Sequence, residues 1–411
     1  MKPLVEAQRE VLTAMAPLRE AEVPLAEALG LCLTESVVAP GPVPPFANSS
    51  VDGFAARASD TAGAPVDLEV LEDVPAGRLP TQVLRPGTVA RVMTGAPLPE
   101  GADAVVMVEQ TAPAAAGWVR VAAPVAAGEG VRAAGSDIHA GVEVFPAGER
   151  LTPGHLGVLA ALGVARPRVR RRLRVSVLST GDEVVPAEAE GPAPGRIRDA
   201  NRPLLLGLLA ELGAEAVDLG IVGDDAAQLA DALSSAAEGA DAVITSGGVS
   251  VGDFDLVKQV LGTLGGVQFW QVALQPGKPF AFGSLGGVPF FGLPGNPVSV
   301  FVAFEQLVRP ALLRRMEARA LFRPRVPGRL TAPVRTDPGR AVFLRVSAAF
   351  RGGVWEAEPS GGQGSHVLSA LARADAFAVV PAGVGDLEPG AGVELEMFRW
   401  PEVRTMEEVL G

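Results

Sequence analysis

The feature that most constrains the fold is a regular alternation of strand-like and helix-like segments between Leu173 and Met316. Strand-like runs such as 173–179 and 241–245 are separated by runs with helical spacing, such as 203–212. Strands that alternate with helices of this length predict a doubly wound, mostly parallel α/β sheet. Ligands of such sheets bind in the crevice beyond the carboxyl ends of the strands, so the loops there are the first candidates for a functional site.

The loops that follow the predicted strands carry glycines and carboxylates. They are TGDE at 180–183, the aspartates at 224–225, SGGVSVGDFD at 246–255, QPGKP at 275–279 and LPGNP at 293–297. One such loop is more often an ordinary turn or helix cap. Five at one edge of a parallel sheet favour a binding site, with glycine-rich amides suited to phosphate or another oxyanion. Carboxylates beside an anion repel it unless a divalent cation lies between them, so the pattern predicts Mg²⁺.

The rest of the chain divides into three further parts. Leu4 to Met15 and 25–33 have helical spacing, and four prolines within 40–45 indicate a linker into a region of short Val-rich runs. Residues after Arg319 return to short strands and predict a compact β barrel or sandwich. The predicted parts are a discontinuous helical connecting region at 1–47 and 140–170, an inserted small β domain at 48–139, the α/β domain at 171–318 and a barrel-like C-terminal β domain at 319–411.

Composition excludes several classes of protein. The chain has 35 basic and 47 acidic residues, and its net charge of -12 disfavours a nucleic-acid or anionic-membrane binder. The single cysteine, Cys32, excludes an internal disulfide and a Cys-cluster metal site, and fits a reducing compartment. The longest uncharged stretch, 279–304, contains four prolines and five glycines, which argues against a membrane span. Charged residues near the amino terminus argue against a signal peptide, so we expect a cytoplasmic protein.

A second set of motifs lies in the inserted β domain. Asp52 and Thr94 each precede glycine, and taken alone each could be an ordinary turn residue. Together with the α/β loops, however, the motifs make the chain resemble the MoeA family of molybdopterin molybdenumtransferases, which is related to the carboxy-terminal domain of gephyrin. The matching stretches run in family order from Pro44 to His366 and are PPFANSSVDGFA, RVMTGAPLPEGADAVVMVE, GSDI, VLSTGDE, RDANR, SGGVSVGDFD, QPGKPFAFG, GLPGNPVS and QGSH.

The resemblance implies a four-part fold and an elongated homodimer with active sites shared between subunits. It implies that adenylylated molybdopterin, made by an upstream molybdopterin adenylyltransferase, receives molybdate while AMP leaves by Mg²⁺-dependent hydrolysis. The product would go to apo-molybdoenzymes. Because the pterin supplies the soft sulfur ligands of molybdenum, a protein with one cysteine can handle the metal.

The resemblance also implies roles for individual residues. The catalytic candidates are Asp52, Thr94, Asp137, Glu183, Asp224 and Asp255, of which Glu183, Asp224 and Asp255 are candidate Mg²⁺ ligands. The substrate-binding candidates are Thr180, Gly181, Ser246, Gly247, Gly248, Lys278, Pro294, Gly295, Pro297 and Ser365. Asp52, Thr94 and Asp137 would reach in from the partner subunit. The three histidines lack metal-ligand spacing, and we expect them to be structural.

Gln271 and Gln275 depart from the family pattern, because many members carry Lys or Arg at these positions. The loss of two positive charges weakens the attraction for molybdate or phosphate unless nearby arginines compensate. A divergent paralogue or a gephyrin-like scaffold that binds molybdopterin without efficient turnover therefore stays open as an alternative. The related adenylyltransferase activity is a third reading, but it needs only the α/β domain and leaves the other parts unexplained.

Overall fold

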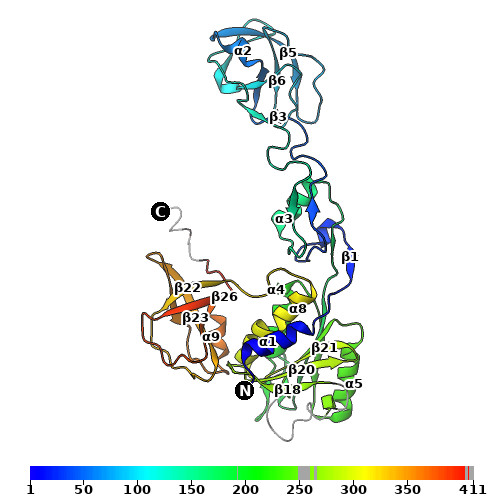
Figure 1. Ribbon diagram of the computed structural model, residues 1–411, viewed down its shortest axis with the longest axis vertical. Coiled ribbons are helices and arrows are strands. Elements are labelled where there is room, and N and C mark those ends of the chain that lie inside the picture. The colour runs from blue at the N-terminus through cyan, green and yellow to red at the C-terminus, as the bar shows by residue number, and fades with distance from the viewer. Residues whose placement is uncertain (192, 249–259, 263–265, 403–405, 407–411) are drawn as a thin grey trace.

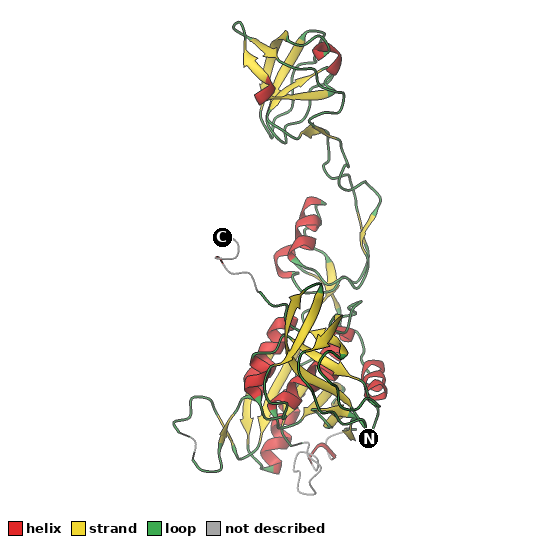
Figure 2. Cartoon of the chain, turned by 90° about the vertical axis from the view of Figure 1, so that its left-hand side faces the viewer, coloured by secondary structure: helices red, strands yellow, loops and turns green. Residues whose placement is uncertain are grey.

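The computed structural model describes residues 1–191, 193–248, 260–262, 266–402 and 406. The molecule is elongated: the inserted β domain lies at one end, and the α/β sheet and the C-terminal sheet lie at the other (Figure 1). A view turned by 90° shows the same separation (Figure 2). The part of the chain that the structure describes contains no helix that is both long and apolar enough to cross a membrane.

The inserted β domain is built on one six-stranded sheet in the order β7-β4-β6-β5-β9-β8. Its core is formed mainly by valine, leucine and alanine side chains on these strands. The elements are β4 (Gly53–Ala56), α2 (Ala58–Thr61), β5 (Val66–Val74), β6 (Thr88–Val92), β7 (Ala104–Met107), η2 (Val108–Gln110), β8 (Thr111–Pro113) and β9 (Trp118–Val121). β3 (Asn48–Ser49) pairs with β10 (Val131–Arg132) in a separate two-stranded ribbon.

The connecting region is held by two short antiparallel ribbons and one helix. β1 (Glu20–Glu22) pairs with β12 (Arg168–Arg170), and β2 (Val37–Val38) pairs with β11 (Glu143–Phe145). The helix α3 (Pro153–Ala161) begins after a capping box at Thr152. The helix that we predicted over 25–33 is instead a single 3₁₀ turn, η1 (Leu25–Glu27). Gly30, at φ +78°, takes a backbone conformation that a helix cannot continue.

The α/β domain contains a six-stranded sheet in the order β16-β13-β17-β21-β20-β18. The first four strands are parallel, whereas β20 is antiparallel to both of its neighbours. The sheet is thus mostly parallel, as predicted. The strands are β13 (Arg174–Thr180), β16 (Glu215–Val222), β17 (Ala242–Ser246), β18 (Gln268–Gln271), β20 (Pro279–Leu285) and β21 (Val288–Leu293), with a small ribbon of β14 (Val184–Val185) and β15 (Ile197–Arg198) beside them.

Helices cover both faces of this sheet, as a doubly wound fold requires. Alternate residues of β13 face opposite ways: Val177 joins the core of α4, α7 and α8, and Leu178 joins the core of α5. α1 (Leu4–Thr13) also packs on the first of these cores. The other helices are α4 (Asn201–Leu212), α5 (Ala226–Ala237), α7 (Pro297–Ala303), the π-helical turn η3 (Phe304–Val308) and α8 (Arg309–Arg315). Most of the helix predicted over 256–264 lies outside the described residues.

The C-terminal domain is a closed five-stranded barrel, in agreement with the prediction. β23 pairs with both β24 and β25, which closes the ring β23-β24-β22-β26-β25. β19 (Leu274–Gln275), from the α/β domain, adds to β23 in parallel. The elements are β22 (Arg325–Leu330), β23 (Ala341–Arg351), β24 (Val354–Pro359), α9 (Leu368–Ala372), β25 (Ala376–Val380) and β26 (Gly392–Met397).

Candidate active site

A cavity of about 220 Å³ lies at the carboxyl edge of the α/β sheet, where β13, β17 and β21 end. Six of the residues predicted from the sequence line it: Thr180, Glu183, Ser246, Gly247, Gly295 and Pro297. They come from three loops that are separated by more than forty residues in the sequence. The parallel pairing of the strands is what brings these loops together.

The ends of the three strands interlock through the glycine-rich turns. Gly247 has φ +94°, and its N–H donates to the Leu293 carbonyl over 3.1 Å. A Cβ at this position would lie 2.7 Å from the Thr180 carbonyl oxygen, so a larger residue would force the two strand ends apart. The cavity floor therefore depends on glycine at 247.

Asn201, at the start of α4, joins two of these loops. Its Nδ2 donates to Ser246 Oγ and to the Gly295 carbonyl, each over 2.7 Å. The buried carboxylate of Asp199 accepts from the Asn201 N–H over 3.1 Å and anchors this helix start. We did not select Asn201 from the sequence, although it lies in the RDANR motif, because an Asn before a helix reads as a cap.

The C-terminal barrel closes one side of the cavity. Asn296 Nδ2 donates to Ser365 Oγ over 3.0 Å, and the Val298 N–H donates to the Ser365 carbonyl over 3.1 Å. The neighbouring His366 lines the cavity. From the sequence we did not place this histidine at the site, because only the docking of the barrel brings residue 366 beside the α/β loops.

Arg345 holds the segment that carries Ser365 and His366. Its guanidinium donates to the carbonyls of Gly362 and Gly364, each over 3.1 Å, and the residue is only 1% exposed. Burial lowers the pKa of Arg345 to about 10, so the side chain stays charged at neutral pH. This role could not be predicted from the sequence, since Arg345 is one of many arginines in the chain.

Two carboxylates face each other at the ends of β13 and β16. Asp182 Oδ1 accepts from the Asp224 N–H over 3.0 Å, and Asp224 Oδ2 accepts from the Asp182 N–H over 3.3 Å. Each carboxylate thus uses one oxygen in the pair, and both residues are exposed. Asp224 was predicted and Asp182 was missed. Asp255 lies outside the described residues.

The carboxylates of Glu183 and Asp224 could bind Mg²⁺ only together with further ligands from a substrate. The described part of the chain contains no cluster of three or more His, Cys, Asp or Glu side chains arranged to hold a metal. Mg²⁺ is usually held by one or two carboxylates together with substrate phosphates. The exposed side chains of Glu183 and Asp224 supply that number of carboxylates beside the cavity.

Two of the predicted residues of the inserted β domain, Asp52 and Thr94, are hydrogen-bonded to each other. Asp52 Oδ1 accepts from the Thr94 N–H over 2.7 Å and from Thr94 Oγ1 over 2.9 Å, and these bonds lower the pKa of Asp52. Asp137 is exposed, and its N–H donates to the Val43 carbonyl over 3.0 Å. Within one chain the inserted β domain is far from the α/β domain that contains the cavity (Figure 1). The structure therefore does not join these residues to the cavity of their own subunit.

The remaining predicted residues of the α/β loops do not line the cavity. Lys278 is half-buried and does not line the cavity; its carbonyl accepts from the Val272 N–H over 2.8 Å. The QPGKP loop connects β18 to the antiparallel β20 and still lies at the carboxyl edge of the sheet. Gly181, Gly248 and Pro294 belong to the loops that follow β13, β17 and β21, but they do not line the cavity.

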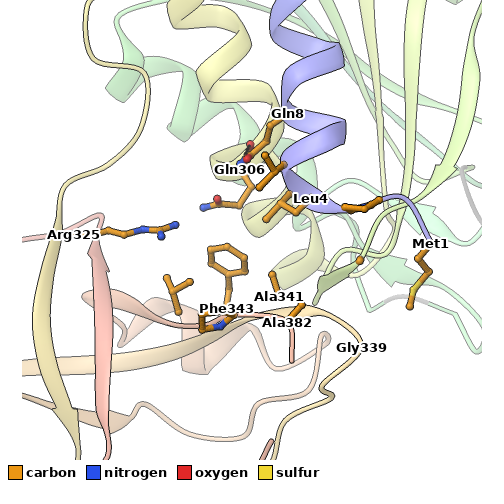
Figure 3. A pocket seen from close by; sticks show the side chains of 14 residues that line it. Met1, Leu4, Gln8, Gln306, Arg325, Gly339, Ala341, Phe343 and Ala382 are labelled. Carbon is orange, nitrogen blue, oxygen red and sulfur yellow. Dashed lines mark hydrogen bonds between the residues drawn. The ribbon is translucent and has the colours of Figure 1, made fainter. Parts of the chain in front are cut away.

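A larger cavity of about 670 Å³ lies between α1 and the C-terminal barrel (Figure 3). Leu4 and Phe343 give it an apolar wall, and Gln306 and Arg325 point into it from two sides. It contains none of the residues that the sequence motifs selected. The small polar cavity, and not this one, is the candidate active site.

Comparison with known proteins agrees with the order of the parts. Residues 2–163 match the MoeA N-terminal region (domains I and II), residues 176–314 match a probable molybdopterin-binding domain, and residues 327–398 match the MoeA C-terminal region (domain IV). These matches define the class as a multidomain protein built around a molybdopterin-binding α/β domain.

Full-length relatives make the identification more specific. The chain is 40% identical over 408 residues to molybdopterin molybdenumtransferase 2 of Mycobacterium tuberculosis, covering 97% of this chain and 99% of the relative. It is 39% identical over 404 residues to molybdopterin molybdenumtransferase of Haemophilus influenzae, with the same coverage. The crystal structure of the molybdopterin biosynthesis MoeA protein of Pyrococcus horikoshii superposes with a TM-score of 0.78 at 35% identity, covering 97% of this chain and 99% of that one.

The chain belongs to the MoeA family of molybdopterin molybdenumtransferases. It is thus an enzyme of molybdenum cofactor biosynthesis.

Proposed function

We propose that the chain inserts molybdate into adenylylated molybdopterin and releases AMP by Mg²⁺-dependent hydrolysis. The observation that carries the proposal is the cavity at the carboxyl edge of the α/β sheet, where glycine-rich turns and hydrogen-bonding side chains lie beside exposed carboxylates. In the hydrolysis, water adds to one phosphorus of the pyrophosphate link and the bond to the bridging oxygen breaks. The products are AMP and the pterin phosphate.

The residues have separate tasks in this proposal. The Gly248 N–H and Thr180 would bind phosphate oxygens, because backbone N–H groups in such turns attract anions, whereas the N–H groups of Gly181 and Gly247 already donate to the Val222 and Leu293 carbonyls and shape the turns. Glu183 and Asp224 would hold Mg²⁺, which when bound places positive charge on the phosphate oxygens. Pro294, Gly295 and Pro297 shape the loop that leads into α7.

We further propose that the active site is shared in a homodimer. Asp52 and Thr94 are exposed on the inserted β domain, which lies far from the α/β domain of its own chain (Figure 1). A second subunit is the simplest source of such groups at the α/β cavity. The inserted β domain at 48–139 would then reach the α/β domain of its partner. In this proposal the other parts of each subunit are the connecting region at 1–47 and 140–170, the α/β domain at 171–318 and the C-terminal β domain at 319–411.

The biochemical setting follows from the reaction. A cytoplasmic molybdopterin adenylyltransferase would supply the substrate, and apo-molybdoenzymes would accept the product. The neutral Gln271 and Gln275 leave the scaffold alternative to be tested directly, since they carry no charge to attract molybdate.

The test is single-turnover release of AMP from adenylylated molybdopterin by the purified full-length protein, with and without molybdate and Mg²⁺. We expect release that requires both ions and yields a pterin able to activate an apo-molybdoenzyme. Tight binding of the pterin without AMP release would contradict the proposed activity and favour the scaffold.

A further inference from the structure

Two oxygen atoms at the α/β cavity are buried and lack a hydrogen-bond partner in the part of the chain that the structure describes. They are Ser179 Oγ, near the end of β13, and Asn201 Oδ1, at the start of α4. Both residues line the cavity, and Ser179 is 2% exposed. Because an unpaired buried polar atom destabilises a fold, such atoms at a cavity indicate that a ligand pairs with them.

The orientation of the Asn201 amide is fixed by its surroundings. The Gly295 carbonyl can only accept a hydrogen bond, so the amide atom that faces it at 2.7 Å is the nitrogen. That nitrogen also donates to Ser246 Oγ, which uses both of its hydrogens. Asn201 Oδ1 is therefore an acceptor that needs a donor, whereas the hydroxyl of Ser179 can donate or accept.

This pattern selects one part of the substrate. Ionised phosphate and molybdate oxygens only accept hydrogen bonds, so they cannot satisfy Asn201 Oδ1. A nitrogen heterocycle whose ring edge has an N–H beside an acceptor satisfies both residues. The volume of about 220 Å³ is below the range of about 300–1,000 Å³ for drug-sized ligands, and it suits one ring system instead of the whole substrate.

We infer that Ser179 and Asn201 form a subsite for the edge of a nitrogen heterocycle, with an N–H of that edge donating to Asn201 Oδ1 and Ser179 donating to the adjacent acceptor. The inference rests on the proposed function for its choice of ligand. Both halves of adenylylated molybdopterin carry such an edge: the pterin has a ring N–H beside a carbonyl, and the adenine has an exocyclic amino group beside a ring nitrogen.

The test measures binding of neopterin, a pterin without phosphate, and of AMP to the full-length protein by calorimetry. Ser179→Ala removes a hydroxyl that makes no bond within the described protein, so the variant should be at least as stable as the parent. We expect it to weaken binding of one probe by about tenfold, the effect of one lost hydrogen bond. Whichever probe is weakened identifies the ring that the subsite binds.

Thr245→Val is the matched control. Thr245 Oγ1 is also buried without a described partner, on the neighbouring β17, but the residue does not line the cavity. It should bind both probes like the parent. The inference is overturned if Ser179→Ala binds both probes normally or if the parent binds neither probe. It is also overturned if Thr245→Val weakens probe binding as much as Ser179→Ala does. AMP release by the parent together with normal probe binding by Ser179→Ala would refute the subsite alone and leave the proposed function standing.

Discussion

Thr94 directs both its backbone N–H and its hydroxyl at the same carboxylate oxygen of Asp52, at 2.7 Å and 2.9 Å. Asp52 is exposed, so these bonds, and not burial, fix the direction of its side chain. They also favour the charged form, which is why the pKa of Asp52 lies below its usual value. The pair thus presents an ionised, oriented carboxylate on the surface of the inserted β domain.

Thr94→Val should raise the pKa of Asp52 towards its ordinary value, because the hydroxyl bond is lost while the backbone bond remains. A carboxylate with a depressed pKa stabilises the folded state above the unfolded-state pKa, and that contribution disappears as pH falls through the folded-state pKa. The difference in stability between parent and variant is therefore present at neutral pH and disappears as pH falls through the folded-state pKa of Asp52. An NMR titration of the Asp52 carboxyl carbon measures the shift. An unchanged pKa would show that the hydroxyl bond is absent in solution.

Gly247→Ala should destabilise the protein by about 1–3 kcal/mol and reduce activity, because the new Cβ would meet the Thr180 carbonyl and strain a backbone at φ +94°. Gly157→Ala is the control. Gly157 lies in α3 with open space around its Cα and no positive φ, so alanine should stabilise the helix by about 0.5–1 kcal/mol. Chemical denaturation and AMP release measure the two effects. Equal stability of the two variants would contradict the tight packing at 247.

Arg345→Met should loosen the segment that carries Ser365 and His366, since the carbonyls of Gly362 and Gly364 lose their donor. We expect a loss of about 1–3 kcal/mol in stability, the effect of removing hydrogen bonds that a charged group donates. We also expect KM to rise more than kcat falls, because the segment positions the cavity wall. Arg329→Met changes an exposed arginine of the same barrel and should alter neither quantity. A variant of Arg345 with the parent KM would show that the segment is held by other contacts.

The sequence was sufficient to predict the α/β sheet because its strand and helix periods are regular and local. It did not show that β20 reverses direction, because QPGKP looks the same whether it precedes a helix or an antiparallel strand. The cavity residues Asn201 and His366 were missed for a related reason. Each resembles an ordinary cap or loop residue until α4 and the barrel dock beside Ser246 and Gly295. Tertiary contacts across 165 positions, from 201 to 366, have no local signal in one sequence.

The separation of Asp52 from the α/β cavity makes the shared-site proposal testable by mixing two inactive variants. Asp52→Asn should disable the group that a subunit offers to its partner, and Asp224→Asn should disable the cavity of its own subunit. In a heterodimer of the two, one active site receives both defects and the other receives neither. Random association gives half heterodimers, so refolding an equal mixture should restore about one quarter of the parent activity.

The controls for this complementation are each variant refolded alone and an unrefolded mixture of the two homodimers. Both should stay inactive if subunits exchange only on refolding. A chain that carries both Asp52→Asn and Asp224→Asn, mixed with the parent, should place one defect in each of the two sites of a heterodimer, so activity should come from the parent homodimers alone. If the mixture of single variants stays inactive although heterodimers are detected by mass spectrometry, both residues serve the same cavity of one chain. That result would require the inserted β domain to fold back towards its own α/β domain, against the extended arrangement in Figure 1.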